Sequence, residues 1–407
     1  MKPLIFGSFI GNFSQTGDPL LLGWIRPDGT LDEKICRDDM RQIANAGANA
    51  TRLFKPRFEL LVAPGLYDVS QFDQVQFDNT RKAIAVCREF HIMPWLTLWF
   101  NHAEPTPWKN NVQGLKDPYS SVELSEAYIE EVIARLGNGF GVEIICEPYY
   151  KGVWSDKKPM QVGTCWYWLG RMIEKLWACG VPAENIIYGP ELTYTYDRAA
   201  KTFNIIAAKK MYDQAAEVVR IDLKNQGWTL DAINKKLNAG WQTQHTCARA
   251  GEVIDGVTWE IGRESQFIAE IWGKETSLRR CMASDDGSRV KPADGEPWSR
   301  PTPEQQYISA RGLMEYPFPK GLAIEVLGYK KDGQIYESLK AVSQAVFDST
   351  GEWPDNYGKF PEPVEPDAPP VIPPLIINDD KPKITWQGWL GLAVILVSLI
   401  LFVIAIS

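Results

Sequence analysis

The sequence predicts an α/β fold, a (β/α)8 TIM barrel that occupies residues 1–352. Two observations lead to this fold class. Short, continuously apolar runs alternate with segments of helical periodicity, which indicates parallel strands covered by helices on both faces. The alternation contains eight strand–helix units, and eight such units closed into a ring form a TIM barrel. An open, doubly wound sheet is the alternative, and it is disfavoured because no Gly-x-Gly-x-x-Gly sequence opens a predicted helix.

Four units make up the first half of the predicted barrel. Thr30 and Glu33 have the spacing of a capping box, so the first helix is predicted to begin there and to end at Gly47. The four strands are predicted at residues 4–13, 48–54, 92–100 and 142–145. The later helices are predicted at residues 77–90, 122–136 and 166–177.

The second half continues the same alternation. Its strands are predicted at residues 186–188, 241–245, 280–284 and 322–326. Its helices are predicted at residues 199–237, 265–272, 303–314 and 339–347. The region 199–237 is the longest helical prediction in the chain.

The two ends of the chain have different patterns. The apolar stretch at the N-terminus is shorter than the ~7–15 residues of a signal-peptide core, so residues 4–13 are assigned to the first strand. Residues 353–383 are assigned to a linker, because their many prolines favour an extended, semi-rigid segment. From Gly388 to Ile406 the chain is apolar and uncharged, and ~20 such residues cross a bilayer core. Residues 384–407 are therefore predicted to form one transmembrane helix.

This layout predicts a single-pass membrane protein with a C-terminal anchor. Lys381 and Lys383 lie just before the predicted span, and the cysteines read as unpaired. Both features favour a cytoplasmic location for the body. A virion or cell-surface location, as for a viral or phage protein, is the alternative.

The composition disfavours several other classes of function. A formal net charge of -8 and the lack of basic runs argue against nucleic acid as a partner. The 7 Cys are widely spaced, without a Cys-x-x-Cys pair, and read as core thiols. With only 3 His in the chain, we expect no metal site and no cofactor. The sequence leaves the oligomeric state open.

Polar and aromatic residues follow the predicted strands at the end where TIM barrels carry their active sites. Carboxylates bind hydroxyl groups and aromatic rings stack on sugars, so this mixture favours carbohydrate as the ligand; two carboxyl groups ~5–9 Å apart can also cleave a glycosidic bond. The candidate catalytic residues are Glu147, Asp285 and Glu325. The candidate substrate-binding residues are Arg52, Trp99, Asn101, His102, Tyr149, Glu191, Tyr194, Trp241 and His245.

Several of these residues lie in motifs that resemble the clan A glycoside hydrolases, especially the cellulase-like and mannanase-like enzymes. Residues 47–52, Gly-Ala-Asn-Ala-Thr-Arg, resemble the second strand of that family. Phe100-Asn101-His102 resembles the end of its third strand, and His245 the histidine near the end of its sixth. Cys146-Glu147-Pro148 resembles the fourth-strand Asn-Glu-Pro, so the resemblance implies that Glu147 is the acid/base.

The chain departs from the family pattern at two positions. Cys146 replaces the Asn that binds the sugar 2-hydroxyl in the family, and a thiol is a poor substitute for an amide. The family nucleophile is a Glu that ends strand seven, where this chain has Asp285; Glu325 lies on strand eight.

Two hypotheses therefore remain open. In the first, the chain is a membrane-anchored glycosidase in which Glu147 protonates the leaving oxygen. Asp285 or Glu325 then attacks the anomeric carbon or activates water. In the second, the barrel is a catalytically inactive glycan-binding or structural surface protein, for example on a virion.

Overall fold

The computed structural model describes residues 2–14, 23–54, 56, 58–63, 66–100, 122–146, 162–188, 194–197, 202–205, 208–245, 253–254, 257–258, 280–284, 301–315, 321–328 and 333–360. The chain divides into two units, Met1–Glu362 and Pro363–Ser407. Within the described residues, no helix is long and apolar enough to cross a bilayer. The predicted span, residues 388–406, lies outside them.

One parallel sheet of eight strands organises the first unit, in the order β10-β13-β14-β1-β2-β5-β6-β7. The strands are β1 (Leu4–Phe9), β2 (Ala50–Phe54), β5 (Met93–Phe100), β6 (Gly141–Cys146), β7 (Ile186–Ile187), β10 (Gln242–His245), β13 (Arg280–Ser284) and β14 (Gly321–Gly328). A parallel bridge between Ile187 and Trp241 joins β7 to the residue that precedes β10. Two backbone hydrogen bonds support it, from Tyr188 N to Trp241 O at 3.0 Å and from Trp241 N to Ile186 O at 2.9 Å. The two ends of the sheet therefore meet, and the predicted α/β class is confirmed in a TIM-barrel-like arrangement.

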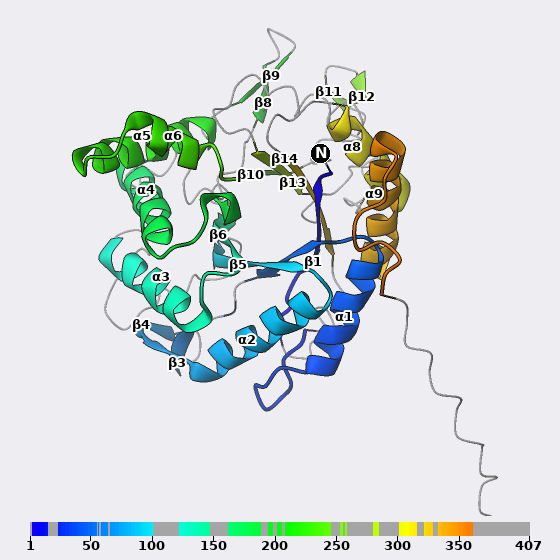
Figure 1. Cartoon of the computed structure of the whole chain (residues 1–407), viewed down its shortest axis with the longest axis horizontal. Coiled ribbons are helices and arrows are strands. Elements are labelled where there is room, and N and C mark those ends of the chain that lie inside the picture. Colours follow the sequence, from blue (N-terminus) through cyan, green and yellow to red (C-terminus); the bar gives the residue numbers. More distant parts are fainter. Residues whose placement is uncertain are drawn as a thin grey trace, which may run out of the picture. The chain divides into compact units, whose positions relative to one another are not determined.

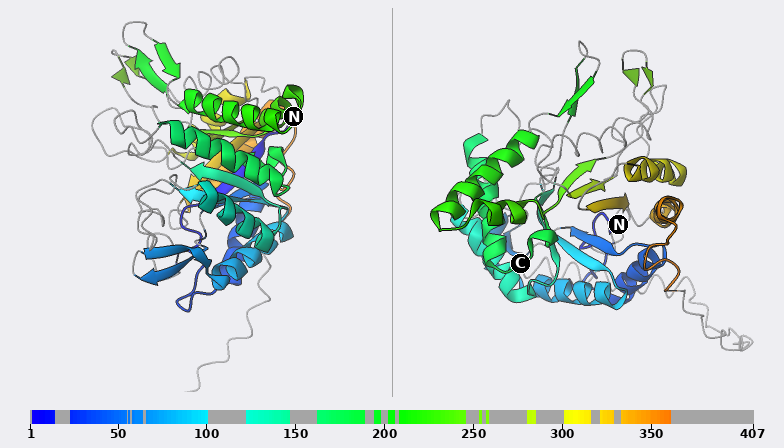
Figure 2. Two further views of the ribbon diagram at one scale, coloured as in Figure 1. Left: turned by 90° about the vertical axis from the view of Figure 1, so that its left-hand side faces the viewer. Right: turned by 45° about the horizontal axis from the view of Figure 1, so that its top comes forward.

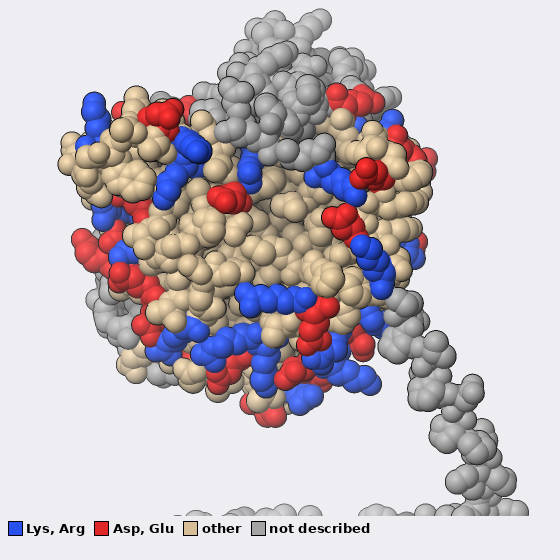
Figure 3. All heavy atoms as spheres, in the orientation of Figure 1, with Lys and Arg blue, Asp and Glu red and all other residues tan. Residues whose placement is uncertain are grey.

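Helices surround the sheet on its outer side (Figures 1 and 2). They are α1 (Glu33–Asn45), α2 (Gln74–Glu89), α3 (Val122–Leu136), α4 (Val162–Ala178), α5 (Ala208–Asn225), α6 (Leu230–Leu237), α8 (Pro303–Met314) and α9 (Gln334–Thr350). The main hydrophobic core lies between these helices and the strands, and includes Leu53, Leu96, Ile144 and Ile324. On the face shown in Figure 3, basic and acidic side chains are interspersed over the surrounding helices, while the centre is uncharged. Ion pairs such as Arg37–Glu89, at 2.7 Å, link neighbouring helices of the first unit.

Two predicted elements differ from the structure for local reasons. Helix α1 begins after Asp32, whose side chain accepts a hydrogen bond from Ile35 N, and not after Thr30. Leu31 is buried and forms a bridge with Ile25, so the chain is still extended at that point. The predicted helix 199–237 is divided into β9 (Thr202–Ile205), α5 and α6. Gly227, at φ +89°, turns the chain between the two helices, and the predicted helix 265–272 lies outside the described residues.

The described residues contain three antiparallel hairpins that were not predicted. They are β3 (Glu59–Ala63) with β4 (Leu66–Phe72), β8 (Tyr194–Asp197) with β9, and β11 (Val253–Ile254) with β12 (Val257–Thr258). Each hairpin follows the C-terminal end of a barrel strand, namely β2, β7 or β10. Figure 2 shows the last two projecting beyond the helices. These insertions therefore enlarge the end of the barrel at which the candidate site residues were predicted.

The barrel interior contains three successive sets of side chains. An apolar set lies towards the N-terminal ends of the strands and consists of Phe6, Ala50, Trp95, Ile187, Trp241, Met282 and Ala323. A second apolar set, Phe54, Cys146 and Leu327, lies towards the C-terminal ends. Between them are the buried polar residues Ser8, Arg52, Thr97, Glu143 and Glu325, here called the polar layer. Along β2 and β14 the order follows the alternation of the strand, with Ala50, Arg52 and Phe54 on β2 and Ala323, Glu325 and Leu327 on β14.

The last described residues pack against the segments that lead into β2 and β5. Asn356 Nδ2 donates to the carbonyl oxygens of Ala48, His91 and Phe90, at 2.8, 3.2 and 3.3 Å. Phe360 packs edge-on against the rings of Phe90 and His91. The packed body therefore extends to Phe360, eight residues beyond position 352.

Candidate functional site

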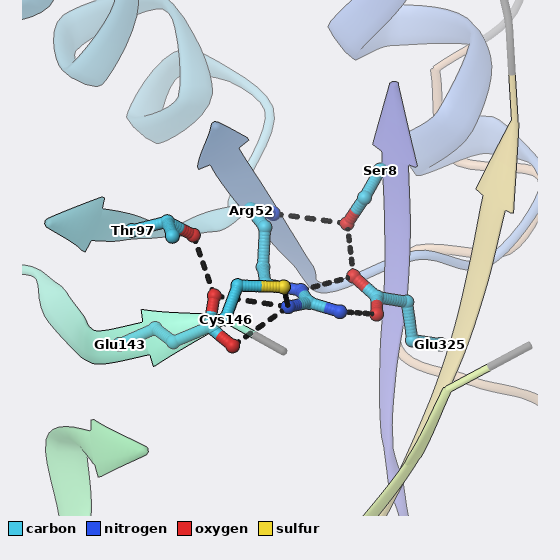
Figure 4. A network of polar contacts seen from close by, with 6 residues as sticks. All are labelled: Ser8, Arg52, Thr97, Glu143, Cys146 and Glu325. Carbon is cyan, nitrogen blue, oxygen red and sulfur yellow. Dashed lines mark hydrogen bonds and ion pairs between the residues drawn. The ribbon is translucent and has the colours of Figure 1, made fainter. Parts of the chain in front are cut away.

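Arg52 is the centre of the polar layer (Figure 4). Its Nε donates to Glu325 Oε1 at 2.7 Å, and its Nη2 forms an ion pair with Glu325 Oε2. Its Nη1 donates to both oxygens of Glu143, at 2.8 and 2.9 Å. Because β2 supplies the arginine while β6 and β14 supply the carboxyl groups, the network links three separate strands across the barrel interior.

Two hydroxyl groups of the described residues also belong to the network. Ser8 Oγ donates to Glu325 Oε1 at 2.6 Å and accepts from Arg52 N at 3.0 Å. Thr97 Oγ1 lies 2.6 Å from Glu143 Oε2. No member of the polar layer is more than 1% exposed, so these hydrogen bonds form without competition from solvent.

Burial and ion pairing set the protonation of both sides of the network. Burial alone would lower the pKa of Arg52, but Glu143 and Glu325 outweigh it and hold that pKa well above the ordinary value. Burial raises the pKa of Glu143, while Arg52 and Thr97 act in the opposite direction. Arg52 is therefore a permanent cation, whereas burial favours the protonated form of Glu143.

The network also reaches the C-terminal end of β6. Arg52 Nη1 lies 3.5 Å from Cys146 Sγ, and the guanidinium carbon lies 5.0 Å from the centroid of the Phe54 ring. Cys146 immediately precedes Glu147 in the chain. The polar layer therefore contacts the residue next to the predicted acid/base.

The structure brings together two of the predicted site residues, Arg52 and Glu325. Six others lie outside the described residues: Glu147, Asp285, Asn101, His102, Tyr149 and Glu191. Tyr194 and His245 lie in β8 and β10, where the backbone is described but these side chains are not. His245 is in parallel register with Ser284 of β13, the residue before Asp285.

Trp99 and Trp241 are corrections to the predicted substrate-binding set, because both rings are buried in packed positions. Trp99 is 2% exposed and packs against Tyr128 of α3 and Trp168 of α4, at centroid distances of 5.5 and 5.0 Å. Trp241 is 4% exposed, belongs to the N-terminal apolar set, and donates its indole N–H to Glu184 O at 2.7 Å. Thr97 faces the barrel interior while Trp99, two residues later, faces the helices. The alternation of β5 is therefore broken between them, which the sequence pattern did not reveal.

Sequence reasoning missed Glu143. The signal was available, because Glu143 stands among Val142, Ile144 and Ile145 just as Glu325 stands within an apolar run. A carboxyl group in such a run is costly to bury without a partner. Ser8 and Thr97 carried no comparable signal, since small hydroxyl residues are common inside strands. Among the described residues, no group of three or more His, Cys, Asp or Glu side chains could hold a metal ion.

Comparison of sequences finds no matching family model and no matching curated protein. Solved structures share the architecture. A glycoside hydrolase family 5 lichenase variant from Caldicellulosiruptor sp. F32, in complex with cellotetraose, has a TM-score of 0.50 at 11% identity, over 84% of this chain and 92% of that one. An exo-β-1,4-mannosidase from Opitutaceae bacterium strain TAV5 has a TM-score of 0.47 at 13% identity, over 86% of this chain but only 60% of the mannosidase. At such identities, the likeness to the lichenase shows a shared fold.

Proposed function

We propose that this chain is a glycoside hydrolase that acts on an oligosaccharide or polysaccharide at the C-terminal ends of its barrel strands. The observation that carries the proposal is the buried network of Arg52, Glu143 and Glu325, next to the point where β6 leads into Glu147. Buried ion pairs are often no more stabilising than apolar packing of the same volume. Such a network, one layer below the C-terminal end of the barrel and in contact with Cys146, therefore favours a role in a site, and the fold shared with the lichenase is in accord with it.

The contacts of Glu325 favour Asp285 as the partner of Glu147. Both oxygens of Glu325 are bound by Arg52, one also by Ser8, and the residue is 1% exposed. A nucleophile must reach the anomeric carbon, so Glu325 is better suited to holding Arg52. Asp285 follows the end of β13, the seventh strand of the barrel, whereas Glu147 follows β6, the fourth.

In this mechanism, Glu147 donates a proton to the leaving oxygen, and Asp285 attacks the anomeric carbon or activates a water molecule. A general acid in this role needs a pKa raised towards neutrality, so that it keeps its proton until reaction. Asn101, His102, Tyr149, Glu191, Tyr194 and His245 are the remaining residues proposed to bind the sugar. All of them follow or end barrel strands or belong to a rim hairpin.

The test is release of reducing sugar from a panel of oligosaccharides and polysaccharides by the full-length chain in detergent. Loss of a general acid typically costs about 10²–10⁴-fold in rate. Glu147→Gln and Asp285→Asn are expected to lose activity in that range. Glu337→Gln, whose side chain is 62% exposed on α9, is the matched control and should keep full activity. Equal activity of Glu147→Gln and the wild type would remove Glu147 from the mechanism.

A non-catalytic carbohydrate-binding protein is the second candidate. It is favoured by Cys146, whose thiol faces Arg52 at the position where the resembling enzymes carry a sugar-binding Asn. In that case, no substrate is cleaved, but immobilised glycans still retain the wild-type chain. Binding that persists in Glu147→Gln without any turnover in the wild type would support this candidate.

Tethering to a membrane through residues 388–406 belongs to the same proposal and is supported by the apolar, uncharged sequence alone. Flotation with phosphatidylcholine vesicles tests it. The full-length chain should float, and a chain ending at residue 383 should remain at the bottom of the gradient. Labelling of engineered cysteines on either side of the vesicle then decides on which side the body lies.

A further inference from the structure

Arg52 divides its donors unequally between two buried carboxyl groups. Glu325 receives Nε and Nη2, and Ser8 adds a third hydrogen bond. Glu143 accepts from a single Arg52 nitrogen, Nη1. Its other contact is with Thr97 Oγ1, at 2.6 Å. The charge of Glu325 is therefore better compensated than that of Glu143.

The side chain of Glu143 is 0% exposed, so solvent cannot compensate a charge on it. An ionised carboxyl group in such a place tends to take up a proton unless its partner is fully committed to it. Burial and the nearby Glu325 both raise the pKa of Glu143. Arg52 and the hydroxyl of Thr97 are the groups that oppose this shift, and Arg52 is shared with Glu325.

The contacts fit a neutral Glu143. Its Oε1 and Oε2 lie 2.8 and 2.9 Å from Arg52 Nη1, and Oε2 also lies 2.6 Å from Thr97 Oγ1. A hydroxyl oxygen can donate or accept, so a proton on Oε2 can be donated to Thr97 Oγ1 over that distance. Nη1 has two N–H groups. With one of them directed to Glu143, the other is directed to Cys146 Sγ at 3.5 Å.

We infer that Glu143 is a neutral, proton-bearing positioning residue, which orients Arg52 against Cys146 and so fixes the end of β6 that leads into Glu147. The activity readout of this inference rests on the proposed hydrolase function. Two further readouts do not depend on any substrate: the protonation state of Glu143 and the rigidity of β6.

The experiment compares two substitutions in the full-length chain. Glu143→Gln keeps one donor and one acceptor without charge, and Glu143→Leu removes both. The infrared spectrum of the wild type minus that of Glu143→Gln at neutral pH should contain the carbonyl band of a protonated carboxyl group. Glu130→Gln, with a side chain 61% exposed on α3, is the matched control and should give no such band. Absence of the band for Glu143 would overturn the neutral state.

Hydrogen exchange of the β6 amides reports on positioning. Glu143→Leu should exchange about tenfold faster or more at Ile145 and Cys146, and Glu143→Gln should stay close to the wild type. If Glu143→Leu does not fold, Thr97→Val serves in its place, because it removes the hydroxyl group and keeps the shape. Unchanged exchange in a folded Leu or Val variant would overturn the positioning role.

Activity separates this inference from the proposed function. In an active enzyme, Glu143→Leu should lower kcat by about 10²-fold with little change in KM, as expected for misplacement of a reacting group. Glu143→Gln should retain kcat within about threefold of the wild type. If a folded Glu143→Leu variant has the kcat of an active wild type, the positioning role of Glu143 is contradicted and the hydrolase function is not. If the wild type is inactive, the hydrolase function is contradicted, and the infrared and hydrogen-exchange results decide on Glu143.

Discussion

Replacing Arg52 by Met should destabilise the barrel more than any other single charge removal in the polar layer. Methionine fills much of the volume of arginine but has no charge and no N–H donors. The substitution leaves Glu143 and Glu325 buried, with side chains that are 0% exposed. Neither carboxyl group then has its main partner.

The structure sets the expected magnitude. Removal of one member of a buried ion pair costs about 3–5 kcal/mol. An unfolding entropy of about 2.1 cal/mol/K per residue corresponds to about 0.75 kcal/mol/K for the unit Met1–Glu362. The expected fall in Tm is therefore about 4–7 °C.

The effect should depend on pH in a defined direction. Without Arg52, the folded state holds both carboxyl groups at a pKa above that of the unfolded chain, so it binds more protons than the unfolded chain does. The stability of the variant is then greatest at acidic pH and falls as the pH rises. The Tm difference from the wild type should widen between about pH 5 and about pH 8.

Differential scanning calorimetry at several pH values measures these quantities. Arg37→Met is the matched control, because the Arg37–Glu89 pair is 42% and 45% exposed. Removal of such a surface pair should cost about 1 kcal/mol or less. The triple variant Arg52→Met, Glu143→Gln, Glu325→Gln should regain most of the lost stability. A Tm of Arg52→Met within about 1 °C of the wild type at pH 8 would refute the reasoning.

Three other regions give independent predictions. Gly141→Ala would place a Cβ 2.1 Å from the Trp95 ring, so it should lower the free energy of unfolding in urea by about 1–3 kcal/mol; an unchanged urea midpoint would contradict this close contact. The pKa of Glu174 is raised to about 7, mainly by burial and then by Asp222. The stability of the wild type should therefore fall as the pH rises from the unfolded pKa of this group towards about 7. Glu174→Gln should flatten that pH dependence, and an equally steep profile in the variant would contradict the role of Glu174. Asn356→Ala removes hydrogen bonds to three carbonyl oxygens and should cost about 1–3 kcal/mol. Limited proteolysis should then cut faster after residue 350, and equal cutting rates would show that the segment is held by other contacts.

Sequence reasoning found part of the polar layer and missed the rest for identifiable reasons. Arg52 was identified through a motif and Glu325 through its position in an apolar run. Glu143 also stands within an apolar run, but the site residues were sought where the strands end, and this led to Glu147 instead. That Arg52 joins the two could not be predicted, because 91 residues separate it from Glu143 and 273 from Glu325.

Trp99 illustrates a different limit. Regular alternation would place it on the same side of β5 as Thr97. The observed packing of Trp99 on Tyr128 and Trp168 depends on helices α3 and α4. A break in alternation of this kind follows from how neighbouring elements fill space, and no local pattern reports it.

By itself, the sequence determined the alternation of strands and helices, because hydrophobic periodicity and breakers act over a few residues. Helices α3 and α8 and strand β13 have the predicted bounds for that reason. Only the tertiary structure decided that the ends of the sheet meet at Ile187 and Trp241, and that one arginine lies between two carboxyl groups inside the barrel. Those contacts join residues far apart in the chain, and the cost of burying each charge is offset only when the curved sheet turns β2, β6 and β14 towards one interior.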